Sequence, residues 1–123
     1  MIVGRVTAEL EAIVRLQIRG AAADKITDID AILDTGFNDQ LTMPRSLIQS
    51  LGLPFQTVGE AKVAGEVLIS TTYFQATVRW GDVQKRISVM ELEGAPLLGM
   101  ALLIQHRIML DVIAGGSVTI ENV

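Results

Sequence analysis

Residues 13–19, IVRLQIR, alternate between apolar and polar side chains. From Val14 to Ile18 every second residue is apolar, and an arginine or a glutamine stands at each position between. This period of two predicts a half-exposed strand. The segment 20–28 has the composition of a solvated turn, and it leads to a short apolar segment, 29–33, that we predict to be a second strand.

A helical pattern follows a brief predicted strand at 41–43. In the segment 45–52, RSLIQSLG, the apolar residues recur at helical spacing and would form one face. We therefore predict a short helix that begins at Pro44 and is closed by Gly52. Pro54 prevents the helix from continuing.

The remainder of the chain is predominantly β-like. Residues 56–90 are rich in β-branched residues, with a hairpin tip at Ala64-Gly65-Glu66 and a turn at Trp80-Gly81-Asp82. The apolar residues after Gly99 predict a helix of about two turns, and residues 108–123 predict a closing hairpin. The pattern as a whole indicates a small, mostly β domain with two brief helices and no alternation of strands and helices.

Composition narrows the class of protein. The 123 residues suit one domain, 1–123, and a chain that is 50% hydrophobic and 20% charged is expected to fold. A net charge of −4 with 4% aromatic residues argues against a nucleic-acid partner. The chain has no cysteine and one histidine, His106. This composition excludes disulfides, most zinc sites and most catalytic triads, so we predict neither a metal nor a cofactor.

The sequence shows no features of a signal peptide or of a membrane-spanning segment. Its start lacks a basic segment followed by an apolar core, and no apolar stretch approaches the roughly 20 residues that a membrane span requires. We therefore expect a cytoplasmic protein without a membrane partner.

Two short segments carry the candidate chemistry. In the first segment, Ile32-Leu33-Asp34-Thr35-Gly36, an acid and a glycine turn directly follow an apolar run. A carboxylate at the end of a buried strand is costly to desolvate unless it is hydrogen-bonded or paired. Pro96-Leu97-Leu98-Gly99 repeats the arrangement of two apolar residues before a glycine. One segment contains an acid and the other does not.

The two segments, with the β-rich stretch between them, resemble the single-domain retropepsin-like aspartic proteases of the prokaryotic type. The resemblance covers about residues 10–121. It implies a small closed β-barrel or sandwich with one or two short helices that acts as a two-fold dimer. It also implies an aspartic endopeptidase that hydrolyses peptide or protein substrates.

The chemistry of such an enzyme requires two carboxylates that share a proton, one acting as base on a water and the other polarising the scissile carbonyl. This chain has one Asp-Thr-Gly and is too short for two lobes, so the partner acid would come from a second copy in a homodimer. We expect activity at acidic pH that declines as the shared proton is lost.

The resemblance also implies roles for individual residues. Asp34 would be the catalytic acid and base, Gly36 would offer its N–H to that carboxylate, and the Thr35 hydroxyl would bond across the dimer axis. The residues expected to contact substrate lie in the two apolar segments, after the glycine turn, and in a flap over the site: Ile32, Leu97, Phe37, Asn38, Asp39, Ala64 and Gly65. The sequence departs from the viral relatives at Phe37, where they have alanine, and at Met100, where they have arginine.

Other readings of the same residues stay open. Asp34 could be a turn former that bonds its own backbone, and the domain could be a non-catalytic dimer that holds peptides or scaffolds a partner. The triplet could also be fortuitous in a structural β domain. An Asp28-Ile29-Asp30 phosphotransfer site is disfavoured because such sites need a larger α/β fold. We predict that His106 is a surface residue at the end of the last helix.

Overall fold

The computed structural model describes residues 1–20 and 25–123, and within them ten strands form one sheet. A single α-helix, α1 (Arg45–Leu51), and a short 3-10 segment, η1 (Ala64–Glu66), are the helical elements of these residues. The strands are β1 (Ile2–Val6), β2 (Ala12–Arg19), β3 (Ile26–Leu33), β4 (Leu41–Met43), β5 (Phe55–Val63), β6 (Val67–Trp80), β7 (Val83–Glu91), β8 (Leu97–Leu98), β9 (His106–Leu110) and β10 (Ser117–Asn122). The predicted mostly β class is confirmed.

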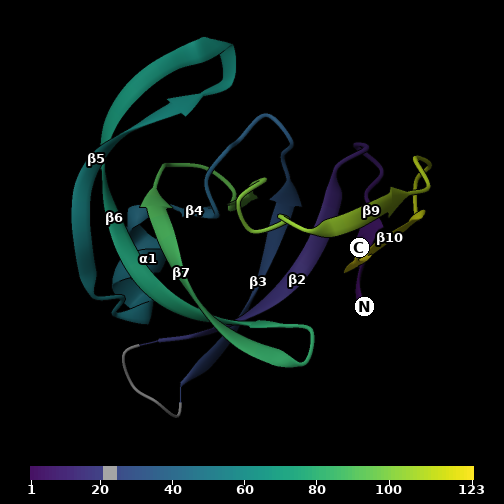
Figure 1. Cartoon of the computed structure of the whole chain (residues 1–123), viewed down its shortest axis with the longest axis horizontal. Helices are drawn as coiled ribbons and strands as arrows, with labels where there is room; N and C mark the ends of the chain where they lie inside the picture. Colours follow the sequence, from purple (N-terminus) through teal and green to yellow (C-terminus); the bar gives the residue numbers. More distant parts are fainter. Residues whose placement is uncertain (21–24) are drawn as a thin grey trace.

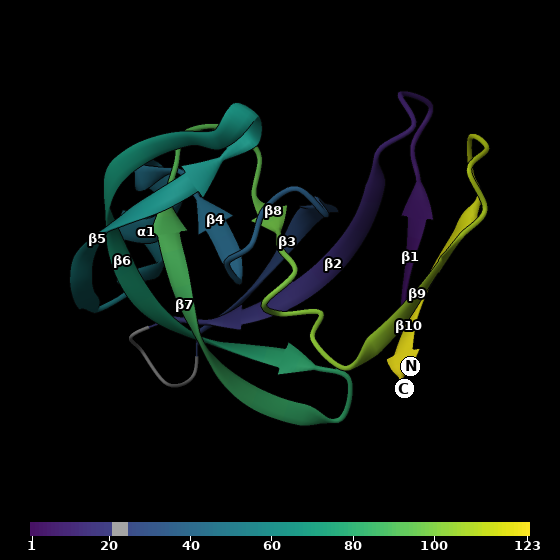
Figure 2. The ribbon, with the colours of Figure 1, turned by 45° about the horizontal axis from the view of Figure 1, so that its top comes forward.

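The sheet curves back on itself. Its strand order is β5-β6-β7-β4-β8-β3-β2-β1-β10-β9, and β2 pairs additionally with β6, so the strands from β6 to β2 form a closed ring. Strands β1, β10 and β9 extend from this ring on the side that carries both termini (Figure 1). On the other side the long β5–β6 hairpin rises from the ring and bends back over it, as Figure 2 shows from a second direction.

The alternation in β2 places its residues as predicted. Val14 and Ile18 are fully buried in the main core, whereas Arg15 on the opposite face donates a hydrogen bond from Nε to Asp30 Oδ1 at 3.1 Å. That hydrogen bond and the charge of Asp30 raise the pKa of Arg15. Asp30 therefore has a structural partner on the neighbouring strand.

Strand β3 begins earlier than the sequence pattern indicated. Residues 26–28, which we assigned to a turn, already pair with β2. The hydrogen bonds to β2 impose an extended conformation on these three residues, two of which are polar. The predicted turn also covered residues 21–24, which lie outside the described residues.

The predicted helix at 45–52 is confirmed as α1. Gly52 ends it in the left-handed conformation, with φ of 64°, and its N–H donates to the Gln49 carbonyl at 3.0 Å. Pro44 stands just before the helix rather than at its first position. Nowhere in the described ranges is there a helix of the length and apolarity that crossing a membrane would take.

The second predicted helix, after Gly99, is wrong. Residues 100–105 form consecutive turns in which the Leu103 N–H donates to the Met100 carbonyl at 3.1 Å and the His106 N–H donates to the Leu103 carbonyl at 3.0 Å. These bonds close over three residues instead of four, and Gln105, with φ of 64°, then reverses the chain into β9. The closing hairpin of β9 and β10 is confirmed.

Candidate active site

The two short apolar segments of the sequence lie side by side. Strands β3 and β8 pair in parallel, with Ile32 opposite Leu97 and Leu33 opposite Leu98. The Asp34 N–H donates to the Leu98 carbonyl at 3.0 Å, which continues the pairing one step beyond the end of β3. This pairing fixes the backbone from which the Asp34 side chain projects.

The Asp34 carboxylate is half-exposed and is held at one oxygen. The Gly36 N–H donates to Asp34 Oδ1 at 2.9 Å, as the resemblance implied. A Cβ on Gly36 would lie 3.3 Å from the same oxygen, so glycine permits the close approach. No ion pair of Asp34 occurs within residues 1–20 and 25–123, and the second carboxylate oxygen remains available to a ligand.

The loop after β3 is clamped over Gly99. The Gly99 N–H donates to the Gln40 carbonyl at 3.0 Å, and the Met100 N–H donates to the Phe37 carbonyl at 2.8 Å. A Cβ on Gly99 would lie 2.2 Å from the carbonyl oxygen of Asp39 and 2.8 Å from that of Phe37. The second apolar segment therefore ends in glycine because the loop that carries Asp34 crosses its backbone there.

A buried threonine supports the same arrangement and was missed by sequence reasoning. Thr42 is 1% exposed, and its Oγ1 accepts a hydrogen bond from the Leu97 N–H at 2.9 Å. This bond joins β4 to β8 at the residue before Leu98, whose carbonyl accepts from the Asp34 N–H. A threonine between two apolar residues, Leu41 and Met43, is the signal that could have drawn attention to it, since a buried hydroxyl requires a partner.

The three residues after the glycine turn lie in different surroundings. Phe37 is buried at 3% exposure, Asn38 is exposed, and Asp39 is half-buried. The Tyr73 hydroxyl of β6 donates to Asp39 Oδ2 at 3.0 Å. Burial, and after it the hydrogen bond to Asp39 and the charge of that residue, raise the pKa of Tyr73 to about 12. Tyr73 was not among the predicted site residues.

The predicted hairpin tip is confirmed at Ala64–Glu66, where Gly65 takes the left-handed conformation with φ of 78°. Strands β5 and β6 pair from this tip back to Phe55, with an irregularity of register between Thr57 and Phe55. In Figure 1 the tip and the loop after β3 both lie at the upper edge of the molecule. The role of this hairpin as a flap, which the resemblance implied, stays a prediction.

An apolar cavity of about 550 Å³ opens beside Thr35. Thr35 is exposed, and in the described part of the chain its hydroxyl takes part in no hydrogen bond. The cavity is lined from four parts of the chain by Leu10, Glu11, Ala12, Ile32, Leu33, Thr35, Leu103, Ile108 and Leu110. An open apolar surface therefore adjoins the acid.

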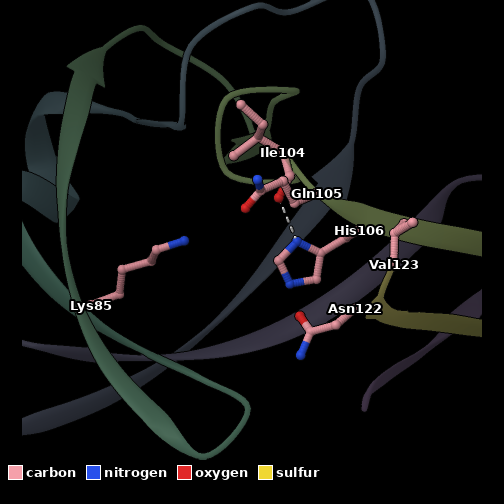
Figure 3. Close-up of a pocket in the computed structure, with 6 residues that line it drawn as sticks. All are labelled: Lys85, Ile104, Gln105, His106, Asn122 and Val123. Atoms are coloured by element: carbon pink, nitrogen blue, oxygen red, sulfur yellow. Dashed lines mark hydrogen bonds between the residues drawn. The ribbon is translucent and has the colours of Figure 1, made fainter.

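A cavity of about 600 Å³ between β7 and the C-terminal strands has a different character (Figure 3). Its lining includes Lys85 and His106 but not Asp34. His106 is half-buried in β9, so its predicted place at a helix end is wrong. Its Nε2 accepts from Trp80 Nε1–H at 3.1 Å, and its Nδ1 lies 2.8 Å from the Ile104 carbonyl oxygen. Both ring nitrogens therefore have partners within the fold.

Among the described residues, no three or more histidine, aspartate or glutamate side chains form a group that could hold a metal ion. The site therefore offers carboxylate chemistry from Asp34, backbone N–H donors, and the adjoining apolar surface.

Comparison with known proteins identifies the fold. Neither a protein-family model nor a curated protein sequence matches the chain. A crystal structure of a retropepsin-like aspartic protease from Rickettsia conorii is similar, with a TM-score of 0.58 and 14% sequence identity over 99% of this chain and 91% of that chain. The chain has the retropepsin-like fold that the resemblance predicted, whereas the roles of its individual site residues stay predictions.

Proposed function

We propose that this protein is an aspartic endopeptidase that acts as a homodimer, with a water activated between Asp34 and the partner subunit's Asp34. The observation that carries the proposal is the geometry of the acid. Its carboxylate stands at the end of β3, with one oxygen bound by the Gly36 N–H at 2.9 Å and the other without a partner among the described residues. A surface turn former would have no need of the clamp on Gly99 that fixes this loop.

The chemistry follows from two carboxylates at one site. They share one proton, because two negative charges in contact are strongly unfavourable. The ionised carboxylate removes a proton from the water as its oxygen attacks the scissile carbonyl, and the protonated carboxyl donates to the carbonyl oxygen. In the collapse of the tetrahedral intermediate, the carboxyl that took the proton of the water gives it to the leaving nitrogen as the C–N bond breaks. The other carboxylate takes a proton from one hydroxyl of the intermediate as the product carboxyl forms. Cleavage should be fastest at acidic pH, and a rate that keeps rising above about pH 8 would contradict this mechanism.

The surface around Asp34 supports a dimer. Thr35 has an exposed hydroxyl, and the apolar cavity beside it is open in the single chain. A two-fold axis near Asp34 would place the same surface of a second copy against it, so that each copy covers the other. The chain carries one Asp-Thr-Gly, so an isolated protomer would have half of the required acid pair.

Replacing Asp34 by asparagine tests the catalytic role. We expect cleavage of an unfolded protein substrate to fall by about 10²–10⁴-fold or more, because the remaining amide can neither accept nor share the proton. The matched control is Asp28→Asn, an exposed acid at the far end of the same strand, which should keep wild-type cleavage. Equal activity of wild type and Asp34→Asn would overturn the proposal.

Mixing the wild-type protein with Asp34→Asn tests whether the two subunits share one active site. At equal amounts and free exchange, about a quarter of the dimers would contain two Asp34 carboxylates, so cleavage per wild-type chain should drop to about half. Unchanged activity per wild-type chain would show that one protomer suffices. A wild-type protein that binds an unfolded substrate without cleaving it would favour the scaffold function instead.

A further inference from the structure

We propose that Tyr73 is a positioning residue that ties the β5–β6 hairpin to the loop carrying Asp34, and so sets how the hairpin closes over a bound peptide. The inference rests on the proposed function only for its effect on cleavage. The tether itself is a property of the fold and can be measured without any activity.

The outer part of the hairpin has little core of its own. Val58, Val67 and Leu68 are 62%, 54% and 62% exposed. A two-stranded ribbon with exposed side chains is marginally stable in water by itself. Its position must therefore be set by contacts nearer its base.

Those contacts come from the face of β6 that carries Ile69, Thr71 and Tyr73, since alternate residues of a strand share a face. The Thr71 hydroxyl donates to the Glu91 carbonyl of β7 at 2.6 Å, and the Tyr73 hydroxyl donates to Asp39 Oδ2 at 3.0 Å. Of these two hydrogen bonds, the one from Tyr73 reaches the loop after β3.

An apolar cluster separate from the main core surrounds this bond. Its buried members are Phe37 from the loop, Ala61 from β5 and Met90 from β7, with Ile69, Tyr73, Leu92 and Leu97 packed against them. The Tyr73 hydroxyl also lies 3.6 Å from Met90 Sδ. The phenol thus crosses a small apolar layer and ends at a carboxylate, which makes its hydrogen bond charge-assisted and less exposed to competing water.

The glycine at position 59 lets the ring take this place. A Cβ on Gly59 would lie 3.3 Å from Tyr73 Cε1 and 3.8 Å from Cδ1, so the aromatic ring covers the backbone of the adjacent strand. Tyr73, which belongs to β6, therefore also contacts β5.

The other end of the tether is equally fixed. The Asp39 carbonyl accepts from the Ala101 N–H at 3.2 Å, and a Cβ on Gly99 would lie 2.2 Å from the same carbonyl oxygen. Asp39 is thus part of the clamped loop that begins at Asp34. A movement of Tyr73 relative to Asp39 is a movement of the hairpin relative to the catalytic acid.

Amide hydrogen exchange of Tyr73→Phe tests the tether. This variant removes the hydroxyl and keeps the ring. We expect amide exchange in residues 58–69 to accelerate about tenfold, because this factor corresponds to the loss of a hydrogen bond to a charged group at a partly exposed site. Exchange in β2, β3 and β10 should stay unchanged. The matched control is Thr72→Val, which removes the neighbouring hydroxyl on the opposite face of β6. Its exchange should equal that of wild type.

Asp39→Asn provides a second variant that removes the charge of the acceptor and keeps the ring cluster. It should accelerate exchange in the same residues, and combining it with Tyr73→Phe should add little, because both act on one bond. Unchanged hairpin exchange in either variant, additive effects in the double variant, or equal acceleration over the whole chain would overturn the tether.

Steady-state kinetics tests the role of the Tyr73–Asp39 hydrogen bond in cleavage. In Tyr73→Phe we expect KM for an unfolded protein substrate to rise about tenfold while kcat stays within about twofold, because the acid is intact and the closed hairpin is less populated. A fall in kcat alone would overturn the positioning role. If wild type shows the protected hairpin but cleaves nothing, the proposed function fails and the tether stands, so the two failures are distinguishable.

Discussion

Replacing Gly99 by alanine should displace the loop that carries Asp34 without changing any residue of that loop. The new Cβ would lie 2.2 Å from the Asp39 carbonyl oxygen, 2.5 Å from Phe37 Cδ2 and 2.8 Å from the Phe37 carbonyl oxygen. Ordinary contact begins at 3.4 Å, so the Asp39 oxygen must retreat from 2.2 Å to 3.4 Å, about 1.2 Å. The Phe37 ring can turn aside, but the two carbonyls belong to the backbone and move only with the loop.

This displacement has two consequences of different size. Overpacking of this kind costs about 1–3 kcal/mol of the free energy of unfolding, which leaves most molecules folded in a domain of ordinary stability. A catalytic group displaced by about 1 Å can lose about 100-fold in rate. We therefore expect kcat/KM per folded molecule to fall about 100-fold in Gly99→Ala, far more than the folded fraction falls.

Denaturant unfolding supplies the folded fraction, and initial rates on an unfolded protein substrate supply kcat/KM. Gly20→Ala is the matched control, because its Cβ would lie 2.5 Å from the Leu51 carbonyl oxygen at the end of β2 remote from Asp34. It should lose similar stability and keep wild-type kcat/KM per folded molecule. Wild-type kcat/KM in folded Gly99→Ala would refute the reasoning.

Three further predictions concern the surroundings of the site. Phe37→Ala should lower the free energy of unfolding by about 3–5 kcal/mol, whereas Phe55→Ala, at 63% exposure, should change it by less than about 0.5 kcal/mol in the same denaturant titration. Tyr73 is the chain's one tyrosine, so phenolate absorbance should titrate near pH 12 in the folded protein. The unfolded chain loses that proton near its ordinary value of 10.0, so stability from this group is complete below pH 10 and is lost as the pH rises towards 12; in Tyr73→Phe that decline should be absent. Leu110→Lys, in the cavity beside Thr35, should weaken the dimer in sedimentation and lower cleavage on dilution, and a dimer as tight as wild type would contradict the proposed interface.

The sequence predicted the features that depend on neighbouring residues. The alternation around Leu16 identified the buried face of β2, and Gly52 identified the end of α1. The apolar pairs before Asp34 and before Gly99 identified the two segments that meet at the site. Each of these signals lies within a few residues of the element that it predicts, because it reflects strand period, helix period or backbone conformation.

What the sequence did not predict depends on residues far apart in the chain. Tyr73 and Asp39 are 34 residues apart, and Thr42 and Leu97 are 55 residues apart, so no local pattern marks either bond. The apolar run after Gly99 buries its leucines in turns, although the same spacing fits a helix, because the chain must enter β9 directly afterwards. In each case tertiary contacts decide between structures that local sequence permits equally.

In the proposed enzyme, assembly and proton sharing would be one process. Each protomer holds Asp34 rigidly, with one oxygen on the Gly36 N–H and the loop clamped on Gly99, so the carboxylate cannot easily turn away from a second one brought against it. In the proposed dimer two carboxylates in contact would retain a proton between them, so dimerisation would be linked to proton uptake and favoured at lower pH. The attraction that opposes their repulsion has to come from the surface around them, which is where the apolar cavity beside Thr35 lies. The acid would be catalytic only in the assembly that also supplies its proton, so the concentration dependence and the pH dependence of cleavage should change together.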